Sequence, residues 1–148
     1  MIYIGADHRG FELKQRIVSF LEDFGLEITD LGNDHLDPSD DYVDYAGRVA
    51  KAVSENPGSF GILLCGTGVG VDIVANKFDG VRSALVDTSR EAQMARNDDD
   101  ANVISLPADI LDEETSLEII QTFLDTPFSG EQRHQRRLEK IEEIEVNN

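Results

Sequence analysis

Residues 60–70 read FGILLCGTGVG, an apolar run that breaks into three alternating glycines. Residues 71–78, VDIVANKF, follow with a pattern that is compatible with a helix. An apolar run of this length before glycines predicts a buried strand that ends in a tight turn, with a helix directly after it. A strand that leads straight into a helix is the repeating unit of an α/β fold.

The same alternation recurs on both sides of this segment. Further strands are predicted at residues 1–7, 26–32, 81–87 and 102–107. Helices are predicted at residues 11–25, 41–56, 90–98 and 112–126. The first two helices are expected to bury apolar positions that include Leu13, Ile17, Leu21 and Phe24, and Val43, Ala46, Val49, Ala50 and Val53. Because parallel strands need a crossover, normally a helix, this order predicts a three-layer αβα sandwich around a parallel sheet.

The composition fits one packed unit. The chain has 148 residues, of which 40% are hydrophobic, so we expect one domain over residues 1–148 with a charged helical tail from about residue 131. No apolar run approaches the length of a membrane span, and the start, MIYIGADHRG, lacks the regions of a signal peptide. These features predict a cytoplasmic protein without a membrane partner.

The charge balance argues against nucleic acid as a partner. The chain carries 13 Lys and Arg against 30 Asp and Glu, a formal net charge of -17. Nucleic-acid binding needs a cationic surface, which this composition does not supply. A small phosphorylated substrate remains compatible with it, because main-chain N–H groups and a few local arginines can hold one phosphate inside an acidic protein.

Polar residues follow three of the predicted strands, at Asp7 and His8, at Cys65–Gly70 and at Asp87. In a parallel α/β sheet the ligand site lies beyond the carboxyl ends of the strands, where these residues fall. The alternating glycines allow successive main-chain N–H groups to converge on an anion. Cys65 stands just before this loop, where the N–H groups would favour its thiolate form, as a base needs. The alternative reading of Cys65 is a small buried thiol.

A dinucleotide-binding loop is a competing interpretation of the same glycines. Asp87 lies about 20 residues further on, where that motif has its ribose-binding acid. The third glycine of the motif is missing, since Val71 occupies its place, and the segment is not the first strand of the chain. We therefore expect no nucleotide cofactor from this loop. The lone cysteine also excludes an internal disulfide and a multi-cysteine zinc cluster.

Taken together, the motifs resemble the type B ribose-5-phosphate isomerase and galactose-6-phosphate isomerase family. They cover nearly the whole chain in order and are GADHRG at residues 5–10, Leu13-Lys14, Asp41-Tyr42, GILLCGTGVGVDIVANK at residues 61–77, Asn102-Val103, and Arg133-His134 with Arg137. The resemblance implies a five-stranded parallel sheet of Rossmann-like topology, no metal and no cofactor. It also implies a homodimer or homotetramer whose active site is shared between subunits. The implied reaction is aldose–ketose isomerisation of a sugar phosphate through a cis-enediolate.

The resemblance also implies roles for individual residues. Cys65 would be the base that moves a proton between C1 and C2, and Thr67 would assist proton movement between the two oxygens. The main-chain N–H groups that would bind the enediolate oxygen are those of Gly66, Gly68, Val69 and Gly70. The substrate-binding side chains would be Asp7 and Tyr42 for sugar hydroxyls, and His8, Arg133 and Arg137 for the phosphate.

Two positions depart from the family pattern. Asp98 stands where the family commonly has the histidine that opens the sugar ring, and Asp109 stands where it has an arginine. An ordinary aspartate is ionised at neutral pH, so Asp98 would act as an acid only where burial or the neighbouring Asp99 and Asp100 favour its protonated form. We expect Asp98 in the catalytic set and Asp99 beside the substrate. A divalent-metal site at these aspartates is disfavoured, because they lack the alternating spacing of a calcium loop.

These departures leave several substrates open. Ribose 5-phosphate is the leading expectation. A hexose 6-phosphate or a tetrose 4-phosphate is the alternative, and a four-carbon sugar with phosphate on O4 cannot close a furanose ring and needs no ring-opening acid. A different class of function is a catalytically silent member that binds an anionic ligand. The retained Cys65 argues against that reading.

Overall fold

The computed structural model describes residues 1–148 and contains one five-stranded sheet with six helices. The strands are β1 (Ile2–Ala6), β2 (Ile28–Asp30), β3 (Phe60–Cys65), β4 (Ser83–Leu85) and β5 (Val103–Pro107). The helices are α1 (Phe11–Asp23), α2 (Tyr42–Glu55), α3 (Val69–Ala75), α4 (Ser89–Asp99), α5 (Glu113–Asp125) and α6 (Gln132–Asn147). All neighbouring strands are parallel, in the order β2-β1-β3-β5-β4. The predicted α/β class and parallel sheet are confirmed.

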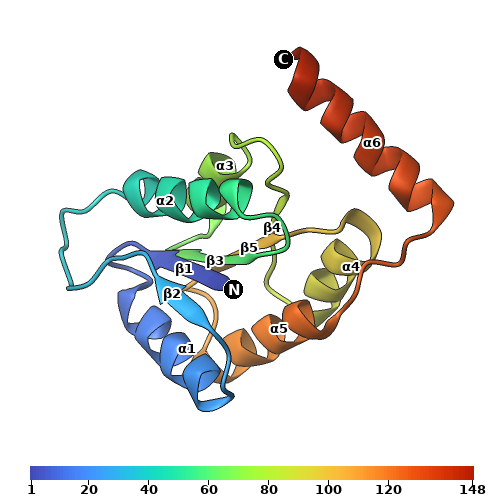
Figure 1. Ribbon diagram of the computed structural model, residues 1–148. Helices are drawn as coiled ribbons and strands as arrows, with labels where there is room; N and C mark the ends of the chain where they lie inside the picture. Colours follow the sequence, from blue (N-terminus) through green and yellow to red (C-terminus); the bar gives the residue numbers. More distant parts are fainter.

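The sheet is covered on both faces, with α2 and α3 on one side and α1, α4 and α5 on the other (Figure 1). Side chains of a strand alternate between faces, and β3 shows the division clearly. Ile62 and Leu64 belong to the core shared with α1, α4 and α5, whereas Leu63 and Cys65 belong to the core shared with α2 and α3. Cys65 is therefore presented on the face that α2 and α3 cover.

The edge strands and helix ends differ from the sequence prediction. The segment predicted as a buried strand at residues 81–87 forms a strand at Ser83–Leu85 alone, and Leu85 is 42% exposed because β4 lies at the edge of the sheet. Two residues predicted to be buried are exposed. Phe24 follows the last turn of α1 and is 63% exposed, and Val43 in the first turn of α2 is 49% exposed.

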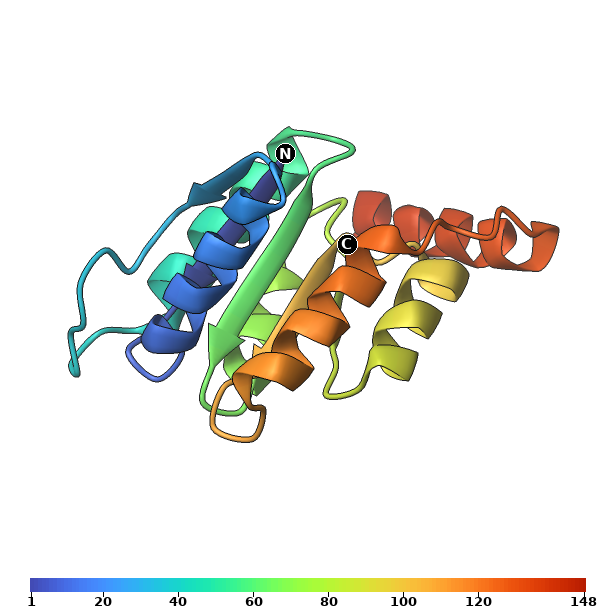
Figure 2. The same cartoon turned by 90° about the horizontal axis from the view of Figure 1, so that it is seen from below.

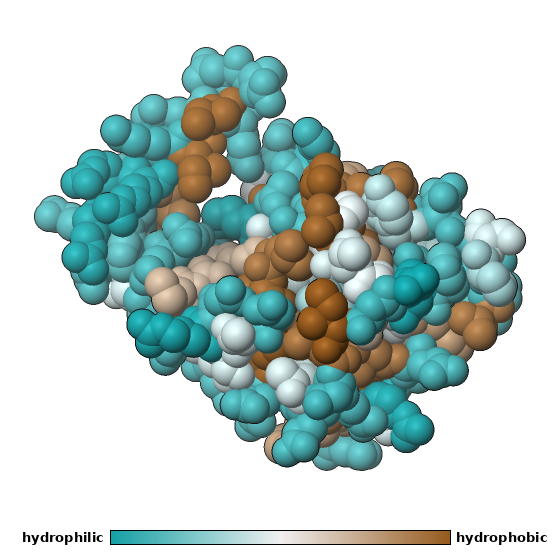
Figure 3. Space-filling model, turned by 180° about the vertical axis from the view of Figure 1, so that it is seen from behind, coloured by the Kyte–Doolittle hydropathy of each residue, from teal (hydrophilic) through white to brown (hydrophobic).

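The last helix, α6, extends away from the body of the molecule (Figures 1 and 2). Its first turns are anchored, since His134 and Leu138 are buried. Further along, Ile144 is 66% exposed and Val146 is 85% exposed. An apolar stripe runs along this helix beside a hollow in the surface (Figure 3). The hollow is a cavity of about 430 Å³ between α6 and the segment that links α3 to β4.

The strand order determines where a ligand can bind. The chain places β2 on one side of β1 and then crosses to place β3 on the other, so the loops after β1 and β3 diverge to opposite faces. Such a reversal opens a crevice at the carboxyl ends of the two strands. No helix of the structure has the length and apolar composition needed to span a membrane.

Candidate active site

A cavity of about 580 Å³ lies at this reversal. Its walls come from the loops after β1, β3 and β5 and from the first turns of α2 and α3. The lining residues are Asp7, Arg9, Tyr42, Cys65, Gly66, Thr67, Val69, Gly70, Ile73 and Asp109. The cavity thus brings together seven residues that were assigned from the sequence to substrate binding or catalysis. They are Asp7, Tyr42, Cys65, Gly66, Thr67, Val69 and Gly70.

The sulfur of Cys65 is held at the base of the glycine loop. The Gly68 N–H donates a hydrogen bond to Cys65 Sγ over 3.2 Å, and an N–H that points at sulfur stabilises negative charge there. Gly68 has a φ of 75°, a left-handed conformation that glycine adopts without strain and that turns its N–H back towards the sulfur. Cys65 is 5% exposed and borders the cavity, so it is shielded from bulk water but within reach of a ligand.

Several N–H groups of the same loop have no hydrogen-bond partner in the chain. The amides of Gly66, Thr67 and Gly70 make none, while the Val69 N–H donates to Thr67 Oγ1 over 3.3 Å. Unpaired amides next to a shielded sulfur form a site for a developing oxyanion. Of the four amides expected to bind an enediolate oxygen, those of Gly66 and Gly70 are unpaired, whereas those of Gly68 and Val69 already donate hydrogen bonds within the loop.

Tyr42 reaches the loop from the first turn of α2. A Cβ added at Gly70 would lie 2.6 Å from the Tyr42 ring, so the ring packs directly on the glycine main chain. This close approach requires glycine at position 70. It places the Tyr42 side chain at the cavity wall.

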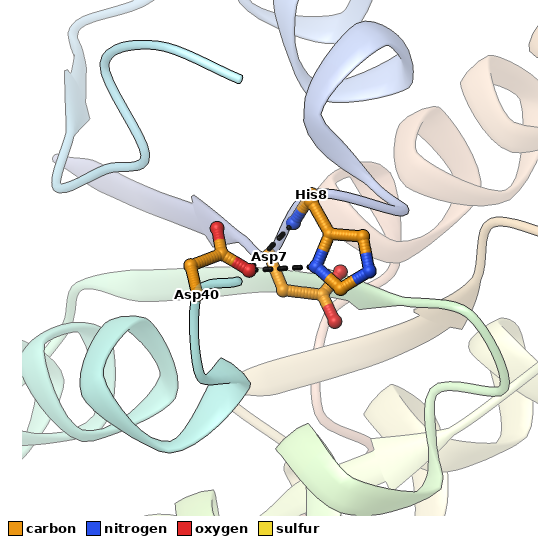
Figure 4. A group of neighbouring side chains, drawn as sticks. All are labelled: Asp7, His8 and Asp40. Atoms are coloured by element: carbon orange, nitrogen blue, oxygen red, sulfur yellow. Dashed lines mark hydrogen bonds and ion pairs between the residues drawn. The ribbon is translucent and has the colours of Figure 1, made fainter. Parts of the chain in front are cut away.

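Asp7, His8 and Asp40 lie close together near the end of β1, and hydrogen bonds join His8 to Asp40 (Figure 4). Asp7 Oδ1 accepts from the Arg9 N–H at 3.0 Å and the Gly10 N–H at 3.3 Å. Burial raises the pKa of Asp7 above its ordinary value, although these two N–H groups act against the rise. His8 is tied to Asp40 through its main-chain N–H and its ring Nδ1.

Asp40 was not identified from the sequence. Its side chain is 3% exposed and also accepts a hydrogen bond of 2.6 Å from Asn33 Nδ2. Burial alone would raise the pKa of Asp40, but the hydrogen bonds from His8 and Asn33 lower it below its ordinary value. One side-chain nitrogen or oxygen atom from each of Asp7, His8 and Asp40 lies within 4.8 Å of the other two, and a hydrogen bond joins the atoms of His8 and Asp40. A signal for Asp40 exists in the sequence, since it lies next to the Asp41-Tyr42 motif.

Arg9 and Asp109 form an ion pair at the rim of the cavity. Arg9 Nε donates to Asp109 Oδ2 over 2.8 Å, and Arg9 Nη2 donates to the same oxygen. Sequence reasoning identified Asp109 as a departure from the family but did not connect it with Arg9. Both residues follow the carboxyl ends of parallel strands, and this shared edge is the signal that could have linked them.

The remaining predicted site residues lie elsewhere in this chain. Asp98 lies in the last turn of α4, shortly before β5 begins, whereas Cys65 is at the carboxyl end of β3. Asp98 Oδ1 accepts from Asn97 Nδ2 over 2.7 Å and lies 3.8 Å from His134 Nε2. His8 and Gly68 adjoin lining residues along the chain but do not line the cavity themselves, and Asp99, Arg133 and Arg137 lie outside it. One chain therefore does not bring Asp98 or these last three residues to the sulfur.

The expected effect of Asp100 on Asp98 needs correction. Asp100 is paired with Arg96 over 2.7 Å and with Arg82 over 3.1 Å. Two guanidinium groups therefore compensate its charge, and it does not act on Asp98 as a free carboxylate. Asp87, at the third of the strand ends singled out in the sequence, borders a neighbouring cavity of about 270 Å³, and Thr67 lines both this cavity and the one beside Cys65.

Known proteins are similar to this chain in both sequence and structure. A family described as Ribose/Galactose Isomerase matches residues 2–141. The probable ribose-5-phosphate isomerase B of Mycoplasma pneumoniae is 47% identical over 95% of this chain and 91% of its own. The ribose-5-phosphate isomerase B of Mycobacterium tuberculosis is 40% identical over 97% of this chain and 89% of its own. The crystal structure of ribose-5-phosphate isomerase B from Mycoplasma genitalium with bound ribulose-5-phosphate superposes with a TM-score of 0.96, at 41% identity, over 99% of this chain and 97% of that one.

The fold, the cysteine loop and these similarities define the class of protein: an aldose–ketose isomerase that acts on sugar phosphates. The family predicted from the sequence motifs is confirmed. The chain belongs to the ribose/galactose isomerase family.

Proposed function

We propose that this protein interconverts ribose 5-phosphate and ribulose 5-phosphate. The names of its relatives and the ribulose-5-phosphate bound to the Mycoplasma genitalium enzyme support this substrate. The observation that carries the proposal is the position of Cys65 at a cavity that is also lined by Gly66 and Thr67, whose main-chain amides have no partner in the chain.

The chemistry begins with the open-chain aldose in the cavity. The Cys65 thiolate removes the proton from C2, and the electron pair of the broken C–H bond forms the C1–C2 double bond. The carbonyl oxygen on C1 then carries the negative charge, and the amides of the loop stabilise it. Thr67 relays a proton between the two enediolate oxygens, and Cys65 returns its proton to C1 to give the ketose.

The ends of the substrate are assigned to separate groups. Asp7 and Tyr42 bind sugar hydroxyls from the cavity wall. His8, fixed by Asp40, binds the phosphate together with Arg133 and Arg137 from a second copy of the chain. The support for a shared site is that both arginines lie outside the Cys65 cavity on α6, a helix with exposed apolar residues. We therefore propose a homodimer, or a homotetramer built from such dimers.

A second candidate substrate is a tetrose 4-phosphate. Asp98 favours it, because this carboxylate stands in place of the imidazole that the family uses to open a sugar ring. A four-carbon sugar with its phosphate on O4 has no furanose form to open. Whichever substrate is used, the cytoplasm is the proposed location of the protein, because the free Cys65 thiol must stay reduced to act as a base.

A panel of phosphorylated sugars tests both candidates. Ribose 5-phosphate, D-erythrulose 4-phosphate and a hexose 6-phosphate would be assayed for aldose–ketose interconversion, with C65A as the inactive control. Turnover of ribose 5-phosphate at the highest kcat/KM supports the main proposal. An equal or higher kcat/KM for the tetrulose phosphate supports the second candidate. No proton exchange at C1 or C2 of any of these sugars would overturn both.

A further inference from the structure

The ion pair of Arg9 and Asp109 lies directly over the glycine loop. A Cβ added at Gly66 would lie 2.7 Å from Arg9 Nε and 2.7 Å from Asp109 Oδ2. The guanidinium is therefore packed against a loop that lines the cavity. Gly66 permits this contact because it has no side chain.

The pair leaves most of the guanidinium available. Arg9 uses its Nε and Nη2 groups on a single oxygen of Asp109, and a guanidinium has further N–H donors on Nη1 and Nη2. The Arg9 side chain is 56% exposed and that of Asp109 is 38% exposed, so a ligand in the cavity can reach both.

The charge of the cavity lining makes Arg9 distinctive. Arg9 is the one cationic side chain among the ten residues that line the cavity, which also include the carboxyl groups of Asp7 and Asp109. Asp109 neutralises the charge of Arg9. A sugar phosphate that binds to Arg9 must therefore compete with Asp109, which already pairs with the guanidinium.

We propose that Arg9 binds the phosphate group of the substrate, and that Asp109 weakens this binding by competing for the same guanidinium. Arg9 follows His8 in the chain, so the imidazole and the guanidinium approach the phosphate from one loop. Planar guanidinium groups suit phosphate because several N–H donors point the same way. The proposal deepens the isomerase function and rests on it for the enzymatic measurement.

The test uses R9M, D109N and the double variant in two assays. Calorimetry with inorganic phosphate measures binding without turnover, and the isomerase assay measures KM and kcat for the sugar phosphate. For R9M we expect the phosphate Kd and the KM to rise about tenfold, the scale of a lost charge-assisted hydrogen bond, with kcat within about twofold. For D109N we expect both constants to fall by about threefold or more, because the competing charge is removed. In the R9M background, D109N should change them by less than about twofold.

Controls separate this effect from net charge. R16M and D23N make the same charge changes at exposed positions on α1, away from the cavity, and should leave both constants unchanged. The proposal is overturned if the protein does not bind phosphate, if R9M matches the unmodified protein, or if D109N acts equally with and without Arg9. A protein that binds phosphate through Arg9 but turns over no sugar would overturn the isomerase function and leave this inference intact.

Discussion

Asp40 holds His8 at two points, through the main-chain N–H of His8 at 3.0 Å and its ring Nδ1 at 2.7 Å. The double contact fixes both the backbone and the ring of a residue at the end of β1. With Nδ1 engaged by a carboxylate, the ring presents Nε2 to a ligand. The histidine is thus oriented before any substrate arrives.

Replacing Asp40 by Asn tests this orientation. We expect D40N to raise the KM for the sugar phosphate by about fivefold with a smaller change in kcat, because Asp40 positions a binding group and does not touch the reacting carbons. D23N serves as the exposed control. An unchanged KM in D40N would show that His8 needs no fixed orientation.

The same variant has a pH-dependent effect on stability. The pKa of folded Asp40 is lowered by its hydrogen bonds, so its carboxylate adds stability above the ordinary carboxyl pKa of 3.8, and this stability is lost as the pH falls through the folded value. Urea unfolding should find D40N less stable by about 1–3 kcal/mol at pH 7. The difference should shrink below pH ~4. A difference that is the same at both pH values would contradict the shift.

Asp72 on α3 should show the opposite trend. Burial raises its pKa, although Ser83 donates to it at 2.7 Å and Ser105 also acts to lower it. Folded Asp72 therefore holds its proton to a higher pH than the unfolded chain, and its contribution to stability is lost as the pH rises through the folded pKa. D72N keeps an acceptor for Ser83 without this ionisation. Its stability relative to the unmodified protein should increase as the pH rises from about 4 to 7, as measured by urea unfolding.

Loss of the proposed base should stop the chemistry and spare the binding. We expect C65A to lower kcat by about 10²- to 10⁴-fold, the usual contribution of a positioned base, while the phosphate Kd stays within about twofold. Incorporation of solvent deuterium at C1 and C2, followed by NMR, measures the proton transfer directly. A residual rate within tenfold of the unmodified enzyme would assign the proton transfer to another group.

The turn at Gly68 provides a matched pair of glycine variants. Gly68 and Gly80 have φ values of 75° and 74°, but a Cβ at Gly68 would lie 3.0 Å from the main-chain carbon of Leu106, whereas a Cβ at Gly80 meets nothing within 4 Å. Both alanine variants should lose about 1 kcal/mol to the unfavourable backbone conformation. G68A should lose at least about 1 kcal/mol more, together with most of its activity, because the loop must shift away from β5. Equal losses of stability and activity in the two variants would show that the loop is not tightly packed against β5.

Mixing two inactive variants tests the shared site. C65A and the double variant R133M/R137M damage different halves of the proposed site. In a mixed dimer one of the two sites would combine the intact halves, so refolding the variants together should restore about a quarter of the normal activity. Separate refolding provides the control. No recovery from mixtures shown to contain mixed dimers would place the whole site in one chain.

The sequence predicted the parts of the site that are close together along the chain. The Cys65–Gly70 loop was readable because an apolar strand, glycines and a helix follow one another without interruption. The Arg9–Asp109 pair was not, because its members are 100 residues apart and meet through the strand order. The exposure of Phe24 was missed for a related reason. Helical spacing gives its direction, but the end of α1 at Asp23 decides whether a neighbour covers it.

Cys65 belongs to the hydrophobic core between the sheet and α2–α3 and also borders the cavity. The side chain at this position therefore has to meet two requirements, packing in the apolar core and contact with the cavity. A hydroxyl at the same position would be both a weaker base and a polar group against the apolar residues of that core. Asp109 is under no such double constraint, because its side chain is 38% exposed at the rim of the cavity and is not part of that core.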